Sequence, residues 1–275
     1  MNAVANSPEK SEGQRRIVAV QNWTLWEYDS VTSTNLVAAE LPAWNAVRAE
    51  TQTAGRGRFQ RAWVSDKGGL WLSAVVPTHR PNHPILPLLA GLAVCELARG
   101  LGARNARLRW PNDVMIGERK LAGVLIDQFR PGLAVIGIGL NVDNQPALYD
   151  GTLRNHTERL GDILPAPVPI EDLITLLLER IRLLVEALNA GELPPLLARV
   201  NELWSKGRRV ELDLDGHIRR GRFAGVDDAG RLLLLDDRGA TTIYHPEQVR
   251  HLNELSDSHE RNIPSPDSHR SCRTH

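Results

Sequence analysis

A short cationic loop is the part of this chain whose residue types are best suited to chemistry. It contains three arginines, Arg56, Arg58 and Arg61, together with Gly55 and Gly57. Glycine tolerates backbone conformations that other residues avoid, and a guanidinium offers forked donors to carboxylate or phosphate oxygens. The pattern predicts a pliable loop that closes over an anionic small molecule. By itself a GRGR tetrapeptide also fits a surface turn with solvated arginines, so the neighbouring sequence has to decide.

Three more polar clusters follow, each at the rim of an apolar stretch. They are Arg109-Trp110-Pro111-Asn112-Asp113, Arg119-Lys120-Leu121-Ala122-Gly123 and Ile136-Gly137-Ile138-Gly139-Leu140-Asn141. Lys120 stands between a predicted turn and the close-packing Leu-Ala-Gly, which favours a side chain directed into a site over one that faces water. Asn112 and Asp113 offer oxygen ligands of the kind that magnesium prefers, although an Asn-Asp pair after proline is also an ordinary turn.

The elements predicted to hold these clusters form a mixed α/β sheet with segregated helices, without a regular βαβ alternation. Strands are predicted over Trp23 to Asp29, Ala46 to Ala49, Leu70 to Val76, Ala106 to Trp110, Val114 to Ile116, Leu121 to Asp127 and Leu133 to Leu140. Helices are predicted over Leu36 to Leu41, Pro84 to Leu101 and Ile170 to Leu188, and a further helix ends near Trp204.

A change of periodicity near Gly207 divides the chain. From there Val210, Leu212 and Leu214 alternate with acidic residues, and Asp215-Gly216 supplies a tight hairpin turn. This pattern predicts a small antiparallel β domain over residues 206–252, after a main domain over residues 16–205. Residues 1–15 and 253–275 are predicted to be disordered, because they hold too few apolar side chains to bury.

The composition excludes several classes of protein. The 275 residues hold 33 Lys plus Arg and 33 Asp plus Glu, so no overall basic field favours nucleic acid. Cys95 and Cys272 are the only cysteines, which excludes a disulfide framework, and Cys95 lies in an apolar helix where a packing role is expected. No apolar run is long enough to span a membrane, and the polar N-terminus lacks a secretory signal, so the protein is expected in the cytoplasm.

Taken in order, the motifs resemble those of the biotin protein ligases, in the monofunctional form that lacks an N-terminal DNA-binding domain. The resemblance covers about Ser30 to Leu252 and includes Ser33-Thr34-Asn35, Gln52, GRGR, RWPND, RKLAG and GIGLN. It implies an α+β catalytic domain similar to class II aminoacyl-tRNA synthetases, with a mixed sheet and helices, that binds biotin and ATP over residues 16–205. A small SH3-like β barrel over residues 206–252 would follow it.

The resemblance also implies a two-step reaction. Biotin and MgATP would give biotinyl-5′-AMP and pyrophosphate, and a lysine of a biotin carboxyl carrier protein domain of a carboxylase would then take the biotinyl group. The first step brings a carboxylate against a polyanion, so it needs several fixed cations. The mixed anhydride must be shielded from water, so the glycine-flanked loop is expected to be mobile when empty and ordered by ligand.

Site residues follow from the same resemblance. The implied catalytic residues are Lys120, Arg56 and Arg58. Biotin binding would involve Ser33, Thr34, Asn35, Gln52, Gly55, Arg56, Gly57, Arg58, Lys120 and Gly123. ATP binding would involve Arg56, Arg58, Arg61, Trp63, Asn112, Lys120 and Asn141, and Asp113 would hold Mg²⁺. One departure concerns the loop itself, because many relatives have glycine where this chain has Gln60, so the loop is expected to be less pliable here.

Two functions from other classes compete with this interpretation. A lipoate ligase or octanoyltransferase shares the catalytic fold, but an octanoyltransferase needs a reactive cysteine that Cys95 does not supply. A non-catalytic, biotin-sensing regulator would leave the cationic loop without a purpose. Only 32 residues precede Ser33, too few for a DNA-binding domain, so no DNA partner is expected. No membrane partner is expected either, and the sequence leaves open whether the enzyme is a monomer or a homodimer.

Overall fold

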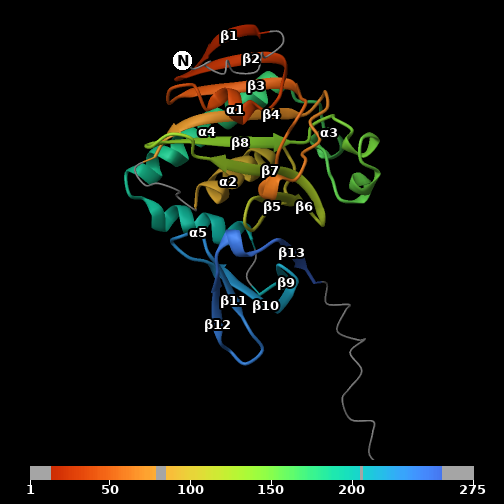
Figure 1. The fold of residues 1–275 in the computed structure, drawn as a ribbon, viewed down its shortest axis with the longest axis vertical. Helices are drawn as coiled ribbons and strands as arrows, with labels where there is room; N and C mark the ends of the chain where they lie inside the picture. Colours follow the sequence, from red (N-terminus) through yellow and green to blue (C-terminus); the bar gives the residue numbers. More distant parts are fainter. Residues whose placement is uncertain (1–13, 79–84, 205–206, 256–275) are drawn as a thin grey trace, which may run out of the picture.

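The computed structural model describes residues 14–78, 85–204 and 207–255, and within them a large mixed sheet with helices is followed by a small antiparallel sheet (Figure 1). The eight strands of the large sheet lie in the order β1-β2-β3-β4-β8-β7-β6-β5. Their bounds are β1 Gln14–Val20, β2 Trp23–Val31, β3 Asn45–Gln52, β4 Leu70–Pro77, β5 Ala106–Arg109, β6 Asp113–Ile116, β7 Arg119–Asp127 and β8 Leu133–Leu140. All pairings are antiparallel except that of β2 with β3.

Helices cover both faces of this sheet. Strand β4 is buried along almost its whole length, and successive side chains of a strand point to opposite faces. Leu70, Leu72 and Ala74 belong to the core shared with the longer helices, whereas Val75 packs in a second cluster with Ala38 of α1. The helices are α1 Thr34–Ala38, α2 Leu86–Gly100, α3 Leu160–Ile163, α4 Ile170–Asn189 and α5 Leu193–Leu203, with short 3₁₀ turns at Arg58–Gln60, Pro146–Leu148, Gly151–Asn155 and Pro246–Gln248.

The small domain is a five-stranded antiparallel sheet in the order β12-β11-β10-β9-β13. Its strands are β9 Arg209–Leu214, β10 His217–Val226, β11 Leu232–Leu235, β12 Thr241–Tyr244 and β13 His251–Glu254. The predicted hairpin at Asp215-Gly216 is present, and both residues have positive φ, as a type I′ turn requires. Among the described residues β12 and β13 remain the two edges of the sheet, so its hydrogen-bond ladder is not closed into a barrel.

The mixed sheet with segregated helices and the smaller antiparallel domain agree with the fold class expected from the sequence. Strand β1 was not predicted; it pairs along β2 at the edge of the sheet, where polar and partly exposed residues are tolerated. It begins at Gln14, inside a segment expected to be disordered. Helix α1, Thr34–Ala38, begins two residues earlier and ends three residues earlier than predicted.

The C-terminal boundary also differs from the expectation. Strand β13 continues to Glu254, two residues beyond the predicted end of the domain, because it completes a backbone ladder with β9 that needs no apolar side chains. The remaining parts of the terminal segments, together with Pro84 and Cys272, lie outside the described residues. Among the described helices none has both the length and the apolar composition to cross a membrane.

Candidate functional site

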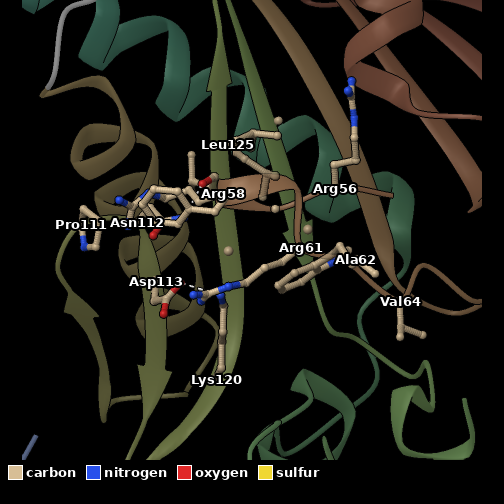
Figure 2. Close-up of a pocket in the computed structure, with 18 of the residues that line it drawn as sticks. Arg56, Arg58, Arg61, Ala62, Val64, Pro111, Asn112, Asp113, Lys120 and Leu125 are labelled. Atoms are coloured by element: carbon tan, nitrogen blue, oxygen red, sulfur yellow. Dashed lines mark hydrogen bonds and ion pairs between the residues drawn. The ribbon is translucent and has the colours of Figure 1, made fainter. Parts of the chain in front are cut away.

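A cavity of about 360 Å³ opens on the face of the large sheet that carries α1. It is bordered by the cationic loop, by the hairpins of β5, β6 and β7, and by residues 249–252 of the small domain. Figure 2 shows Asp113 and Lys120 next to each other in one part of it, where they form an ion pair. Every site residue expected from the sequence lines this cavity except Gly55, which lies behind the wall, against Ser65 and the Trp63 carbonyl.

Three glycines form the floor of the cavity. Gly139 of β8 lies between Trp71 of β4 and Gly123 of β7, and Gly137 is the next residue of β8 on the same face. A Cβ at Gly139 would come within 2.5 Å of the Trp63 indole nitrogen, and one at Gly137 would overlap the Asn35 amide. The bare backbone therefore lets the side chains above approach the sheet closely. Of the three, the sequence interpretation had included Gly123 alone.

The wall beside α1 is a set of uncharged, hydrogen-bonded side chains. Gln52 Oε1 accepts from the Thr34 backbone N–H at 2.8 Å and from its hydroxyl at 3.1 Å. Ser73 lies 2.7 Å from the Thr34 hydroxyl and donates to Asn35 Oδ1 at 2.6 Å. Ser33 occupies the N-cap position of α1 but makes no side-chain cap hydrogen bond. Ser33, Thr34 and Asn35 are all buried, so their polar groups are fixed in direction.

Residues outside the predicted set fix this wall. The Gln52 amide nitrogen donates to Ser65 Oγ at 2.8 Å, and Ser65 donates to the Trp63 carbonyl at 3.1 Å. Asn35 Nδ2 donates to Asp127 at 2.8 Å. Sequence reasoning missed Ser65, Ser73 and Asp127. Only Ser73 carried a usable signal, since it is the one polar residue inside the apolar run of β4.

An ion cluster stands at the other side of the cavity. Lys120 Nζ lies 2.5 Å from one oxygen of Asp113, and Arg109 Nη2 lies 2.7 Å from the other. Burial on its own would raise the pKa of the Asp113 carboxyl, but Lys120 and Arg109 outweigh it and hold that pKa below its ordinary value. The carboxylate therefore stays ionised and directs Lys120, whose ammonium also lies 4.9 Å from the centre of the Trp63 ring.

Asn112 and Asn141 hold backbone around this cluster. Asn112 donates to the Val124 carbonyl at 2.6 Å, and Asn141 donates to the Lys120 carbonyl at 3.3 Å. Both side chains line the cavity, and through these hydrogen bonds they hold the backbone of β7 in place. Trp110 is almost fully buried, and its indole N–H donates to the Gly230 carbonyl of the small domain at 2.9 Å. It packs beneath the site and joins the two domains.

The loop arginines do not converge on Lys120 as expected. In Figure 2 the Arg56 side chain points away from the Asp113–Lys120 pair. Arg58 donates from Nη2 to the Pro246 carbonyl and to the Val249 carbonyl at 3.4 Å, and burial lowers the pKa of its guanidinium. Arg61 donates to the Arg250 carbonyl at 3.0 Å. Carbonyls in and just beyond the 3₁₀ turn Pro246–Gln248 accept hydrogen bonds from the two guanidiniums, an interaction between distant segments that the sequence does not reveal.

The predicted metal and cysteine roles can be judged on the same geometry. Both oxygens of Asp113 already pair with cations, an arrangement that does not fit a magnesium ligand. Within residues 14–78, 85–204 and 207–255 no group of three or more His, Cys, Asp or Glu side chains could hold a metal ion. Cys95 is fully buried, and desolvation raises the pKa of its thiol to about 12, so it is no nucleophile.

Comparisons with known proteins match both parts of the chain. Residues 19–143 match the Biotin/lipoate A/B protein ligase family, and residues 207–253 match the Biotin protein ligase C terminal domain. A relative from Mycobacterium tuberculosis, named biotin–[acetyl-CoA-carboxylase] ligase, is 34% identical over 263 residues, which cover 89% of this chain and 95% of the relative. The bifunctional ligase/repressor BirA of Bacillus subtilis is 30% identical over 236 residues, 79% of this chain and 71% of the relative.

Solved structures agree with these matches. The structure of biotin protein ligase from Aquifex aeolicus in complex with biotin and ATP superposes with a TM-score of 0.75 at 26% sequence identity. The superposition covers 84% of this chain and 99% of that one. The chain therefore shares its fold with that ligase over most of its length.

Proposed function

The chain belongs to the biotin/lipoate A/B protein ligase family and is a biotin ligase, and on that premise we propose that it makes biotinyl-5′-AMP and transfers the biotinyl group to a lysine of a biotin carboxyl carrier domain. One observation carries the proposal. An uncharged, hydrogen-bonded wall and a glycine floor share a single cavity with the Lys120–Asp113 pair. The neutral ureido ring of biotin needs an uncharged, hydrogen-bonding wall. The biotin carboxylate, which must approach a phosphate, needs a cation such as Lys120.

In the first step a biotin carboxylate oxygen attacks the α-phosphorus of ATP, and the bond to pyrophosphate breaks. Lys120 reduces the repulsion between the two anions and stabilises the charge that develops on the phosphoryl oxygens. Asp113 orients the ammonium before the substrates arrive. The hydrogen bonds of Arg58 within the described residues all come from Nη2, which leaves Nη1 and Nε for phosphate oxygens. Arg56 and Arg61 also line the cavity and add positive charge to it.

In the second step a lysine amine of the carrier domain attacks the biotinyl carbonyl carbon, and AMP leaves with the bonding electron pair. The amine loses its proton to solvent in the process. The cationic loop shields the mixed anhydride from hydrolysis by water until the carrier lysine enters. Magnesium is proposed only as the ion that accompanies ATP on its phosphate oxygens, because Asp113 does not fit it as a ligand.

Biotin-dependent exchange of labelled pyrophosphate into ATP tests this function directly. We expect exchange with biotin and none with lipoate or octanoate, followed by transfer of label from biotin to a purified carrier domain. Exchange with lipoate in place of biotin would assign the chain to the lipoate branch of the family. Biotin binding without any exchange would identify a non-catalytic biotin-binding protein and would refute the proposed reaction.

The glycine floor gives a prediction about biotin affinity. Replacing Gly137 by alanine places a methyl group where the Asn35 amide now lies, so Asn35 must move and its bonds to Ser73 and Asp127 are disturbed. We expect the KM for biotin to rise roughly 10- to 100-fold, with a smaller change in the KM for ATP. Gly151→Ala is the matched control, because a Cβ there meets no atom within 4 Å. Equal biotin KM values in both variants would exclude the proposed wall.

A further inference from the structure

The cationic loop is docked on the small domain, in a contact that the proposed reaction does not by itself require. The Phe59 ring lies 4.3 Å from the Arg250 guanidinium and 4.7 Å from that of Arg58. Arg61 reaches the same segment, with Nη2 2.9 Å from the His251 ring nitrogen. A guanidinium over an aromatic face is attractive, most of all where the ring is shielded from water. The loop therefore contacts the small domain through both Phe59 and Arg61.

The backbone of the loop needs such support. Phe59 and Gln60 both have positive φ, 55° and 59°, within the left-handed region that residues with a Cβ adopt at a cost. Two consecutive residues in that region persist only where the surroundings fix them. A hydrogen bond from the Gly57 N–H to the Arg61 carbonyl, at 2.8 Å, closes the loop on itself, but it does not involve either strained residue. The contacts of Phe59 with the small domain supply the missing restraint.

Arg250 contacts this ring from the small domain and is itself bonded to the β9–β10 hairpin. Its Nε lies 2.6 Å from Asp215 in the turn between β9 and β10, and its backbone N–H donates to the Asp213 carbonyl at 2.8 Å. The guanidinium is thus placed between a carboxylate and an aromatic ring. The adjoining residues Val249 and Leu252 line the cavity together with the loop. The polar wall around Thr34 and Gln52, in contrast, is bonded entirely within the large domain.

We propose that Phe59 and Arg250 are a pair of positioning residues, through which the small domain holds the cationic loop ready for the ATP phosphates. The inference rests on the proposed function, and it assigns the small domain a role in nucleotide affinity rather than in biotin affinity. The ring fixes the strained turn, and the turn sets the direction of Arg56 and Arg58. Neither Phe59 nor Arg250 needs to touch the reacting atoms.

The kinetic test compares Phe59→Ala, Arg250→Ala and the double variant in the biotin-dependent exchange assay. We expect each single change to raise the KM for ATP about five- to tenfold and to leave the KM for biotin within about twofold. The double variant should resemble the worse single one, since both remove the same contact. Phe59→Tyr and Arg250→Lys, which keep the ring and the cation, should recover most of the loss. Arg238→Ala, in another turn of the small domain, is the control.

A second readout needs no catalysis. Trypsin cleaves after Arg56, Arg58 and Arg61, and Phe59→Ala keeps all three sites. We expect the ligand-free Phe59→Ala and Asp215→Asn proteins to be cut in this loop several times faster than wild type, while their melting temperatures stay close to it. Biotin with ATP should slow cleavage of every form, as expected of a loop ordered by ligand.

The outcomes separate the two proposals. Equal cleavage of wild type and Phe59→Ala, or equal rises in the KM for ATP and for biotin, would overturn the positioning role. A wild-type protein that shows no exchange at all would overturn the proposed reaction instead, while faster cleavage of Phe59→Ala would still support the docking of the loop on the small domain.

Discussion

Lys120→Ala is expected to reduce biotin-dependent pyrophosphate exchange by about a thousandfold, while the protein remains folded. Lys120 is the cation that the structure places in the cavity with its ammonium directed by Asp113, at 2.5 Å. Removing it leaves two anions to approach each other without their nearest neutralising charge. The fold should survive, because Asp113 keeps its 2.7 Å pair with Arg109. Exchange kinetics and a thermal melt of the same sample measure the two effects.

The neighbouring residue provides a control for this variant. Arg119 begins the same strand, but its side chain is about half exposed and pairs with Glu158 at 3.7 Å. Arg119→Ala should change the exchange rate by less than about twofold, as expected for loss of an exposed ion pair. A Lys120→Ala enzyme with a rate near that of wild type would show that the chemistry does not depend on this ammonium.

Glu254→Ala is expected to destabilise the protein by roughly 3–5 kcal/mol, the cost of leaving a buried charge without its partner. Glu254 forms two 2.6 Å hydrogen bonds with Arg107, and it accepts a third, at 3.0 Å, from the Trp204 indole. Arg107 is 9% exposed, so water cannot replace the lost carboxylate. For a chain of this size the melting temperature should fall by on the order of 10 °C.

The Asp237→Ala variant tests whether the loss of stability in Glu254→Ala comes from the burial of its ion pair. Asp237 pairs with Arg209 at 3.8 Å, but its side chain is 78% exposed. The variant should melt within about 2 °C of wild type, because exposed ion pairs contribute little. Glu254 of the small domain and Arg107 of the large domain link the two domains. If the Glu254→Ala and Asp237→Ala variants have the same melting temperature, this link does not stabilise the protein.

Local patterns were sufficient to predict most of the fold. The apolar runs of β4, β7 and β8 and the leucine spacing of α4 depend only on neighbours in sequence, and their bounds were found to within a few residues. The position of Lys120 beside Asp113 also follows from local structure, since β6 and β7 form a hairpin. These features share short separations along the chain, where periodicity and turn residues carry the information.

The features that the sequence did not reveal depend on pairing between distant segments. Glu254 belongs to a polar stretch predicted to be disordered, and its contacts with Arg107 and with strand β9, both far away in the chain, order it. Arg58 lines the cavity, and its Nη2 also donates to two carbonyls of the small domain, a contact that the sequence did not reveal. A guanidinium donates hydrogen bonds to any oxygen of suitable geometry, so residue type alone could not distinguish a phosphate from a distant backbone carbonyl as its partner.

The glycine floor limits how ligand preference could be changed. Gly123, Gly137 and Gly139 already present bare backbone, so any substitution at these positions narrows the cavity. A bulkier analogue of biotin can be accommodated only by trimming the opposite side, where Trp63 lies. Engineering toward larger substrates therefore has to enlarge the cavity on the side of Trp63, because the floor already sets its maximum depth.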